Sequence, residues 1–187
     1  MAIPKQLLSE LKESYNCNVF FETGLYHGYS ARIALDLGFE KVISIELLQR
    51  FIDMGKEKFS KEIADNRYFI IPDDSSNLGH HLSSVENDRV IFWLDAHVDN
   101  ALTGAVCNPS SICPVVQEIK SLASLKQKPI ILVDDMRIIK GSEPWGDNST
   151  NAVTIEKIVE AINELPFKYD ISYRDSAAAP SDILVAV

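Results

Sequence analysis

The stretch FFETGLYHGYSARIAL, residues 20–35, decides the fold class, because it joins a strand to a helix through a turn with two glycines. The apolar run at its start ends at Glu22 and predicts a buried strand, and a helix is expected from about Ser30 to Leu37. Gly24 permits a tight turn, and Gly28 lets a ligand approach the backbone closely. The N–H groups at the start of the helix, with the Ser30 hydroxyl, can face an anionic group. The G-x-x-x-G spacing differs from the G-x-G-x-x-G of dinucleotide enzymes, so the turn alone does not identify a cofactor.

The rest of the chain alternates apolar runs with helical stretches, which is typical of a parallel sheet with helical crossovers. Four further runs follow along the chain, at Val42–Ile45, Tyr68–Ile71, Val90–Leu94 and Ile130–Val133. Near the C-terminus, Tyr169–Tyr173 and Ile183–Val187 are joined by a loop without a helix, so they are expected to pair antiparallel. We therefore expect one α/β domain over residues 1–187, with residues 1–16 as an N-terminal helix and a mostly parallel sheet with one reversed strand.

Composition excludes several classes of protein. The chain has 187 residues and a formal net charge of −9, and its 18 Lys and Arg form no run, so nucleic acid and membrane surfaces are not expected partners. No stretch approaches the ~20 apolar residues of a membrane helix, and the first residues lack the features of a secretory signal. The three cysteines, Cys17, Cys107 and Cys113, have no disulfide-framework spacing, so reduced thiols and a cytoplasmic location are expected.

Acidic residues end several of the predicted strands. They are Glu22, Glu46, Asp95 and Asp134. In an open α/β sheet, ligands bind at the carboxyl edge of the strands, where the strand order reverses. Carboxylates gathered there predict a polar site, because burying them without a ligand or cation is costly. The alternative is that each carboxylate only caps the helix that follows. Glu46, at the end of the second strand, is placed to bind ribose hydroxyls.

These motifs resemble the class I S-adenosylmethionine-dependent methyltransferases, and most closely their small metal-dependent O-methyltransferases of the catechol, caffeoyl-CoA and macrocin type. The first family motif, E-x-G-x-x-x-G-Y-S, is matched by Glu22, Gly24, Gly28, Tyr29 and Ser30, and the second by Glu46 in VISIEL. The resemblance covers about Val19 to Val187. It implies S-adenosylmethionine as cofactor and a Rossmann-like three-layer sandwich whose seven-stranded, mostly parallel sheet has a reversed last strand.

The resemblance also assigns roles to further residues. Asp74 or Ser75 would lie near the adenine, although Asp and Ser are common in any turn after a proline. One Asp after the fourth strand and an acidic pair after the fifth hold a divalent cation, usually magnesium, in the family. Here these are Asp95, Asp134 and Asp135. Such a cation polarises a substrate hydroxyl.

Two details of this metal set stay open. Asp134 and Asp135 point opposite ways unless a turn begins there, and one of them can instead cap a helix or pair with Arg137. A zinc site of His97 with Cys107 and Cys113 is disfavoured, because the cysteines are five residues apart in place of the usual spacing. Cys113, before Pro114, is expected at a helix N-terminus, which can make a thiol reactive.

The chain departs from the catechol-type pattern at one position. Those enzymes carry a lysine base three residues after the first metal Asp, where this chain has Val98. We expect His97 to act as the base beside Asp95, with a structural role as its alternative. The departure leaves the acceptor open, as a small-molecule or sugar hydroxyl bound by two long loops, Val98–Ile112 and Met136–Asn151.

Two other functions remain alternatives. One is a nicotinamide-dependent oxidoreductase with a similar sheet. The glycine spacing and the acidic residues at the strand ends, called the acidic rim below, argue against it. The other is a non-catalytic member that binds cofactor or a partner protein, which the missing lysine favours and the intact aspartates disfavour. The sequence does not decide between a monomer and a homodimer.

Overall fold

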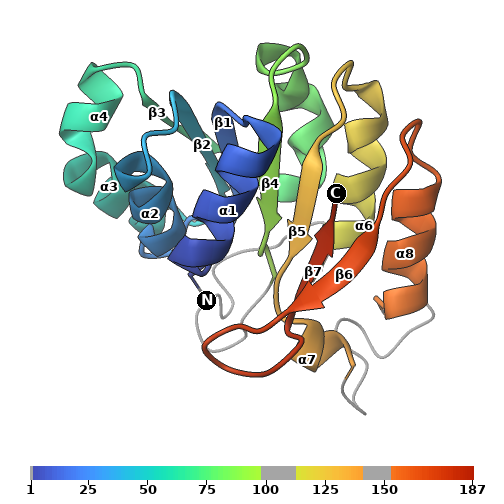
Figure 1. The fold of residues 1–187 in the computed structure, drawn as a ribbon. Helices are drawn as coiled ribbons and strands as arrows, with labels where there is room; N and C mark the ends of the chain where they lie inside the picture. The colour runs from blue at the N-terminus through green and yellow to red at the C-terminus, as the bar shows by residue number, and fades with distance from the viewer. Residues whose placement is uncertain (1, 98–112, 141–152) are drawn as a thin grey trace.

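The computed structural model describes residues 2–97, 113–140 and 153–187, and it contains a seven-stranded sheet between two layers of helices (Figure 1). The strand order is β3-β2-β1-β4-β5-β7-β6. The strands are β1 (Val19–Thr23), β2 (Lys41–Glu46), β3 (Tyr68–Pro72), β4 (Val90–Leu94), β5 (Ile130–Val133), β6 (Ile171–Arg174) and β7 (Ile183–Ala186). Strands β1 to β5 pair in parallel, whereas β7 is antiparallel to both β5 and β6. The expected sheet with a reversed last strand is therefore confirmed.

The helices form one layer on each face of the sheet, as Figure 1 shows. One layer holds α1 (Lys5–Tyr15), α2 (Tyr29–Asp36), α3 (Gln49–Lys58) and α4 (Ser60–Ala64). The other holds the 3-10 helix η1 (Ser75–Ser84), α6 (Val115–Ser121), the 3-10 turn η3 (Leu122–Ser124) and α8 (Ile155–Asn163). The short α7 (Met136–Ile139) lies below the carboxyl edge of the sheet in Figure 1.

The apolar runs explain which strands are central. Every residue of β1, β4, β5 and β7 is buried, because these strands are covered on both faces. Successive side chains point to opposite faces, so Phe20 packs in the core beneath α1 and α2, while Phe21 packs in the core beneath η1, α6 and α8. The edge strands β3 and β6 are partly exposed, as strands with only one neighbour are.

The structure differs from the expected elements in two of the segments expected as turn or loop. Residues after β3, expected to form a turn, continue into η1, and the segment expected as a loop from Met136 begins with α7. The remainder of the two long loops, residues 98–112 and 141–152, lies outside the described residues. Within the described residues, no helix combines the length and the apolar character needed to span a bilayer.

Candidate functional site

The candidate site lies at the carboxyl edge of β1 and β4, where the strand order reverses. Strands β2 and β3 follow one another on one side of β1, and the chain then crosses to the other side, where β4 and β5 follow. The ends of the central strands are held level there: Gly24 N donates to Ile45 O, Asp95 N to Thr23 O, and Asp134 N to Leu94 O. A crevice at such a reversal is where open α/β sheets bind ligands.

The two glycines of the turn after β1 are required by what surrounds them. Gly24 has φ +86°, and a Cβ there would lie 3.2 Å from the Asp95 carbonyl oxygen, so the turn passes close to the end of β4. Gly28 has φ +68°, and a Cβ there would lie 2.6 Å from the Phe59 ring. The side of Gly28 on which a Cβ would lie is therefore filled by protein, and close approach of a ligand to its backbone stays a prediction.

The Ser30 hydroxyl, expected to face an anionic group, is engaged inside the protein. Ser30 is buried in the first turn of α2, and its Oγ accepts a hydrogen bond of 3.1 Å from Ile3 N. This contact fixes the segment before α1 against the start of α2. Binding of an anionic group by the N–H groups at the start of α2 stays a prediction.

Glu46 connects the end of β2 to the glycine turn. Its Oε2 accepts from Tyr26 N at 2.9 Å, and its Oε1 accepts from Leu48 N at 2.8 Å. Each carboxylate oxygen has two lone-pair directions, so both can accept a further hydrogen bond from a ligand. These two hydrogen bonds hold the Glu46 carboxylate in one orientation, beside the glycine turn after β1.

Glu22 is fully buried near the carboxyl end of β1. Ser44 Oγ donates to Glu22 Oε1 at 2.5 Å and lies 2.7 Å from the Tyr68 hydroxyl. Burial raises the pKa of Glu22 to about 8, while the Ser44 hydrogen bond lowers it and the negative charges of Asp95 and Glu46 add to the rise. Glu22 thus carries a proton at neutral pH.

The turn after β3 places Asp74 and Ser75 at the start of η1. Asp74 caps this 3-10 helix, because its Oδ1 accepts from Ser76 N at 2.9 Å and from Ser76 Oγ at 2.7 Å. Ser75 is buried beside α6. Asp74 therefore has a structural role at the start of η1, and a contact with adenine remains a prediction.

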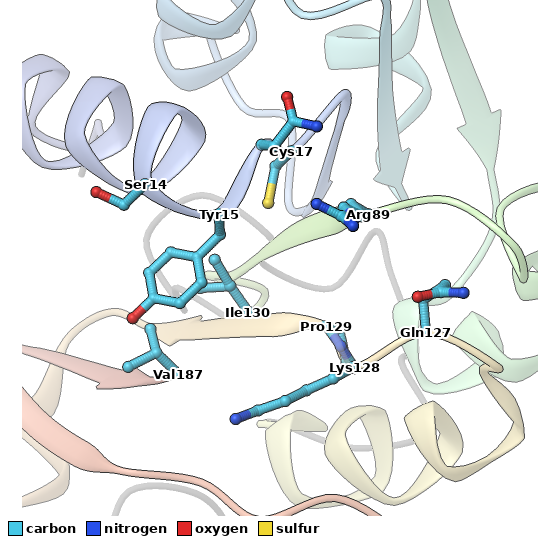
Figure 2. Close-up of a pocket in the computed structure, with 10 residues that line it drawn as sticks. Ser14, Tyr15, Cys17, Arg89, Gln127, Lys128, Pro129, Ile130 and Val187 are labelled. Atoms are coloured by element: carbon cyan, nitrogen blue, oxygen red, sulfur yellow. The ribbon is translucent and has the colours of Figure 1, made fainter.

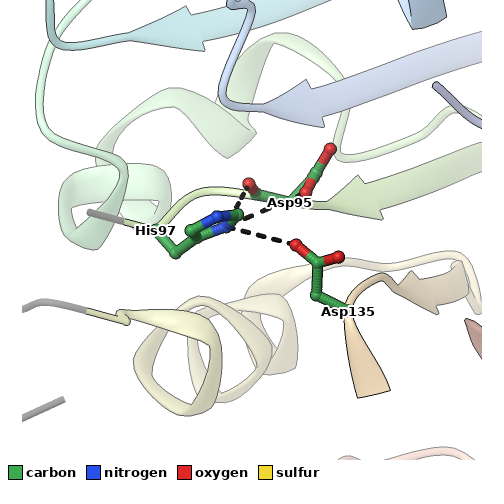
Figure 3. A group of neighbouring side chains, drawn as sticks. All are labelled: Asp95, His97 and Asp135. Carbon is green, nitrogen blue, oxygen red and sulfur yellow. Dashed lines mark hydrogen bonds and ion pairs between the residues drawn. The ribbon is translucent and has the colours of Figure 1, made fainter. Parts of the chain in front are cut away.

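At the ends of β4 and β5, His97 lies between Asp95 and Asp135 (Figure 3). Its Nδ1 is 3.2 Å from the Asp95 carbonyl oxygen, 3.9 Å from Asp95 Oδ1 and 3.6 Å from Asp135 Oδ2. Ligand atoms of all three residues lie within 4.8 Å of one another. The ring therefore points toward the acidic rim, as a base beside Asp95 requires.

The chain turns between Asp134 and Asp135, as joint use of both aspartates requires. Strand β5 ends at Val133, and Asp135 has φ +61°, which an aspartate tolerates better than most residues. Asp134 groups with Asp135 and Asp182 within 4.8 Å, whereas Asp95 groups with Asp135 and His97. Asp135 is thus common to two clusters, and the three predicted metal ligands are divided between them.

Crowding of these carboxylates changes their acidity. Burial, followed by the negative charge of Asp134, raises the pKa of Asp95 well above its usual range. Burial also raises the pKa of Asp134 to about 6, and the charge of Asp135 adds to this rise. A cation brought to this rim would favour the ionised forms of both groups.

Two buried acidic residues beside the candidate site have no signal in the sequence pattern. Asp182, from the loop before β7, is fully buried and accepts hydrogen bonds from Arg137 and Ser176. Glu118, on α6, is also fully buried, next to the turn after β3. The expectation of a reactive Cys113 is wrong, because burial raises the pKa of this thiol to about 12.

A pocket of about 390 Å³ lies at the opposite, amino edge of the sheet (Figure 2). It is lined by the starts of β1, β4 and β5, including Cys17, Arg89 and Ile130. Burial raises the pKa of the Cys17 thiol to about 11, so the thiol is protonated at neutral pH. This pocket is separate from the acidic rim and from the glycine turn.

No protein-family model matches the sequence, and no curated protein matches it significantly. Solved methyltransferase structures match its fold. The O-methyltransferase from Bacillus cereus in complex with SAH (S-adenosylhomocysteine) has a TM-score of 0.64 at 13% identity, over 100% of this chain and 82% of that one. The SAH-bound methyltransferase PaMTH1 from Podospora anserina has a TM-score of 0.60 at 15% identity, over 97% and 76%. Cofactor-bound Rv0187 from MTB has a TM-score of 0.64 at 15% identity, over 100% and 81%. The chain has the Rossmann-like fold of these proteins.

Proposed function

We propose that this chain is an S-adenosylmethionine-dependent methyltransferase that methylates a hydroxyl of a small molecule or sugar with the help of a divalent cation. The observation that carries the proposal is the link between Glu46 and the glycine turn, at the reversal point of a seven-stranded sheet. Neighbours with this fold are bound to SAH, although they share only 13% and 15% identity with the chain.

The cofactor residues are assigned along the carboxyl edge. Glu46 accepts hydrogen bonds from the ribose hydroxyls, and Asp74 or Ser75 lies on the adenine side. The turn from Gly24 to Gly28 and the start of α2 take the amino-acid end of the cofactor, whose carboxylate suits free backbone N–H groups. Glu22 supports this turn from inside the sheet through Ser44.

The acidic rim fits a divalent cation. Asp95 and Asp135 offer two carboxylates close to one another, and Asp134 adjoins them through Asp135, while the imidazole of His97 is assigned to the proton transfer. Magnesium suits these oxygen donors. When bound, the cation supplies Lewis acidity, which lowers the pKa of an acceptor hydroxyl.

The residues of the chain supply the proton transfer. His97 Nδ1 faces the Asp95 carbonyl oxygen, which can only accept, so this nitrogen carries a proton and Nε2 is the basic atom. Bound S-adenosylmethionine would supply the methyl group: the acceptor oxygen would bond to the methyl carbon as the carbon–sulfur bond breaks, which would leave SAH. The hydroxyl proton passes to His97, which the carboxylates of Asp95 and Asp135 stabilise in its charged form.

The net charge of −9 supports a small acceptor over nucleic acid, because the chain's own charge repels phosphate backbones. A nicotinamide-dependent oxidoreductase is disfavoured by the G-x-x-x-G spacing. A non-catalytic, cofactor-binding member is disfavoured by the orientation of His97 toward Asp95 and Asp135.

Calorimetry with SAH and with NAD tests the cofactor. We expect SAH to bind and NAD not to bind. Transfer of a labelled methyl group from S-adenosylmethionine to a panel of phenols, catechols and glycosides, with and without magnesium, then tests the reaction. Binding of NAD in place of SAH would overturn the proposal, and SAH binding without transfer to any hydroxyl would favour the non-catalytic alternative.

A further inference from the structure

Glu118 lies in the first turn of α6 and is fully buried. Its carboxyl faces the hydroxyls of Ser75 and Thr23, the groups that favour its ionised form. Within residues 2–97, 113–140 and 153–187, neither carboxyl oxygen of Glu118 has a hydrogen-bond partner, and the same holds for Thr23 Oγ1. Both carboxyl oxygens of Glu118 and Thr23 Oγ1 are therefore neighbouring buried polar atoms without a hydrogen bond in this part of the chain.

Nothing in the described surroundings compensates a negative charge at Glu118. Burial raises its pKa to about 8, and the charge of Asp74 adds to the rise. The other titratable neighbour is the Cys113 thiol, whose own pKa is raised in part by Glu118. No Lys, Arg or His among the described residues shifts this pKa. A leucine at this position would avoid the cost of burying a carboxyl. A buried carboxyl here is therefore better explained by a role in the neighbouring site.

The neighbours of Glu118 belong to both halves of the candidate cofactor site. Thr23 directly precedes Gly24 at the end of β1, and Ser75 follows Asp74 in the turn after β3. The preceding helical residue, Gln117, donates from Nε2 to Ser76 O at 2.9 Å. Two successive side chains of α6 thus reach the same turn, and the second of them also reaches β1.

We propose that Glu118 is a positioning residue of the cofactor site, whose protonated carboxyl bridges Thr23 and Ser75 and sets the spacing between the turns after β1 and β3. Only the protonated form can donate to one hydroxyl while it accepts from the other. Ionisation leaves an uncompensated charge beneath the cofactor and weakens cofactor binding. The proposal rests on the proposed function, since it concerns the site to which S-adenosylmethionine is assigned.

The test is calorimetry with SAH from about pH 6.5 to about pH 9, where the linkage of binding to a proton held by Glu118 becomes visible. Wild-type affinity is expected to fall about fivefold or more over this range as Glu118 ionises. Glu118→Gln keeps an uncharged group that donates and accepts, so it should retain the affinity at low pH and lose a large part of the decline. Glu118→Leu loses both contacts and should bind about tenfold more weakly at every pH. The control Glu160→Gln makes the same side-chain replacement at an exposed position of α8 and should follow the wild type.

An unchanged pH profile in Glu118→Gln, or wild-type affinity in Glu118→Leu, would overturn the proposal. If Glu118→Leu does not fold, the profile of Glu118→Gln decides alone. If the wild type binds no SAH, the proposed function fails, and hydrogen exchange then decides the positioning role. In that case Glu118→Leu should speed exchange of amides in residues 24–28 and 74–77 while Glu118→Gln should not, and equal exchange in both variants would reject the role.

Discussion

Arg137 Nη1 lies 2.5 Å from Asp135 Oδ1 and also 2.5 Å from Asp182 Oδ2, while His97 faces the other oxygen of Asp135. One guanidinium therefore holds two buried carboxylates, and the imidazole adjoins one of them. Burial disfavours the charged guanidinium, but the two carboxylates outweigh it and raise the pKa of Arg137. The ion pair with Arg137 offsets the repulsion between Asp135 and the neighbouring carboxylates.

Replacement of Arg137 by Met is expected to destabilise the fold by about 1–3 kcal/mol, because Asp182 and Asp135 lose their cation. The loss stays below that of a fully buried pair, since the Arg137 side chain is 35% exposed. Urea unfolding measures the change. The control is Arg174→Met on the edge strand β6, which removes the same charge. Among the described residues, no carboxylate pairs with Arg174.

A divalent cation is expected to stabilise the wild type. Magnesium or manganese should raise Tm, because the cation binds the native rim and not the unfolded chain. Asp135→Asn removes the carboxylate common to both clusters and should abolish this rise. Asp53→Asn, on the exposed side of α3, should leave it intact. An equal rise of Tm in the Asp135 variant would place the bound cation elsewhere.

Glu46→Ala is expected to weaken SAH binding by about 1–3 kcal/mol, the range for losing hydrogen bonds to a charged group. Part of the loss arises because Tyr26 N and Leu48 N lose their common acceptor. Calorimetry measures the loss. The control is Glu57→Gln, which removes a negative charge at an exposed position of α3 and shows how much of the loss comes from net charge alone. Unchanged affinity would remove Glu46 from the cofactor site.

Glu22→Gln is expected to make the protein more resistant to alkaline conditions. The pKa of Glu22 is about 8 in the fold and 4.5 in its reference state, so the native protein keeps a proton that the unfolded chain has released. Stability contributed by this group is therefore present below pH 4.5 and is lost as pH rises to about 8. Gln cannot ionise, and its amide oxygen still accepts from Ser44. In urea unfolding from pH 5 to pH 9, the free energy of unfolding should decline less steeply with pH in the variant than in the wild type. The difference in slope should correspond to about one proton at most.

His97→Gln is expected to bind SAH like the wild type while methyl transfer slows by about 10²–10⁴-fold, the usual contribution of a general base. Gln keeps a similar shape and polar contacts but has no basicity near neutral pH. Rates measured across pH with an accepted substrate should lose their dependence on a group that titrates near neutrality. If the rate is unchanged, His97 is structural.

The sequence by itself determined the alternation of strands and helices, the reversed last strand, and the acidic residues that end β2 and follow β4 and β5. These features depend on local periodicity and on residue types at strand ends, which chain neighbours already specify. The same local information predicted that His97 adjoins Asp95, because the two residues are close in the chain.

Only the tertiary structure decided which distant groups meet. Ser44 joins Glu22 across 22 residues of chain, and Asp182 reaches Arg137 across 45, because strand order places their elements side by side. Likewise Gly28 is required by the Phe59 ring beside it, and Glu118 of α6 is buried beside Thr23 of β1 and Ser75 of η1. Local patterns cannot specify such contacts, since they arise from the packing of whole layers against one another.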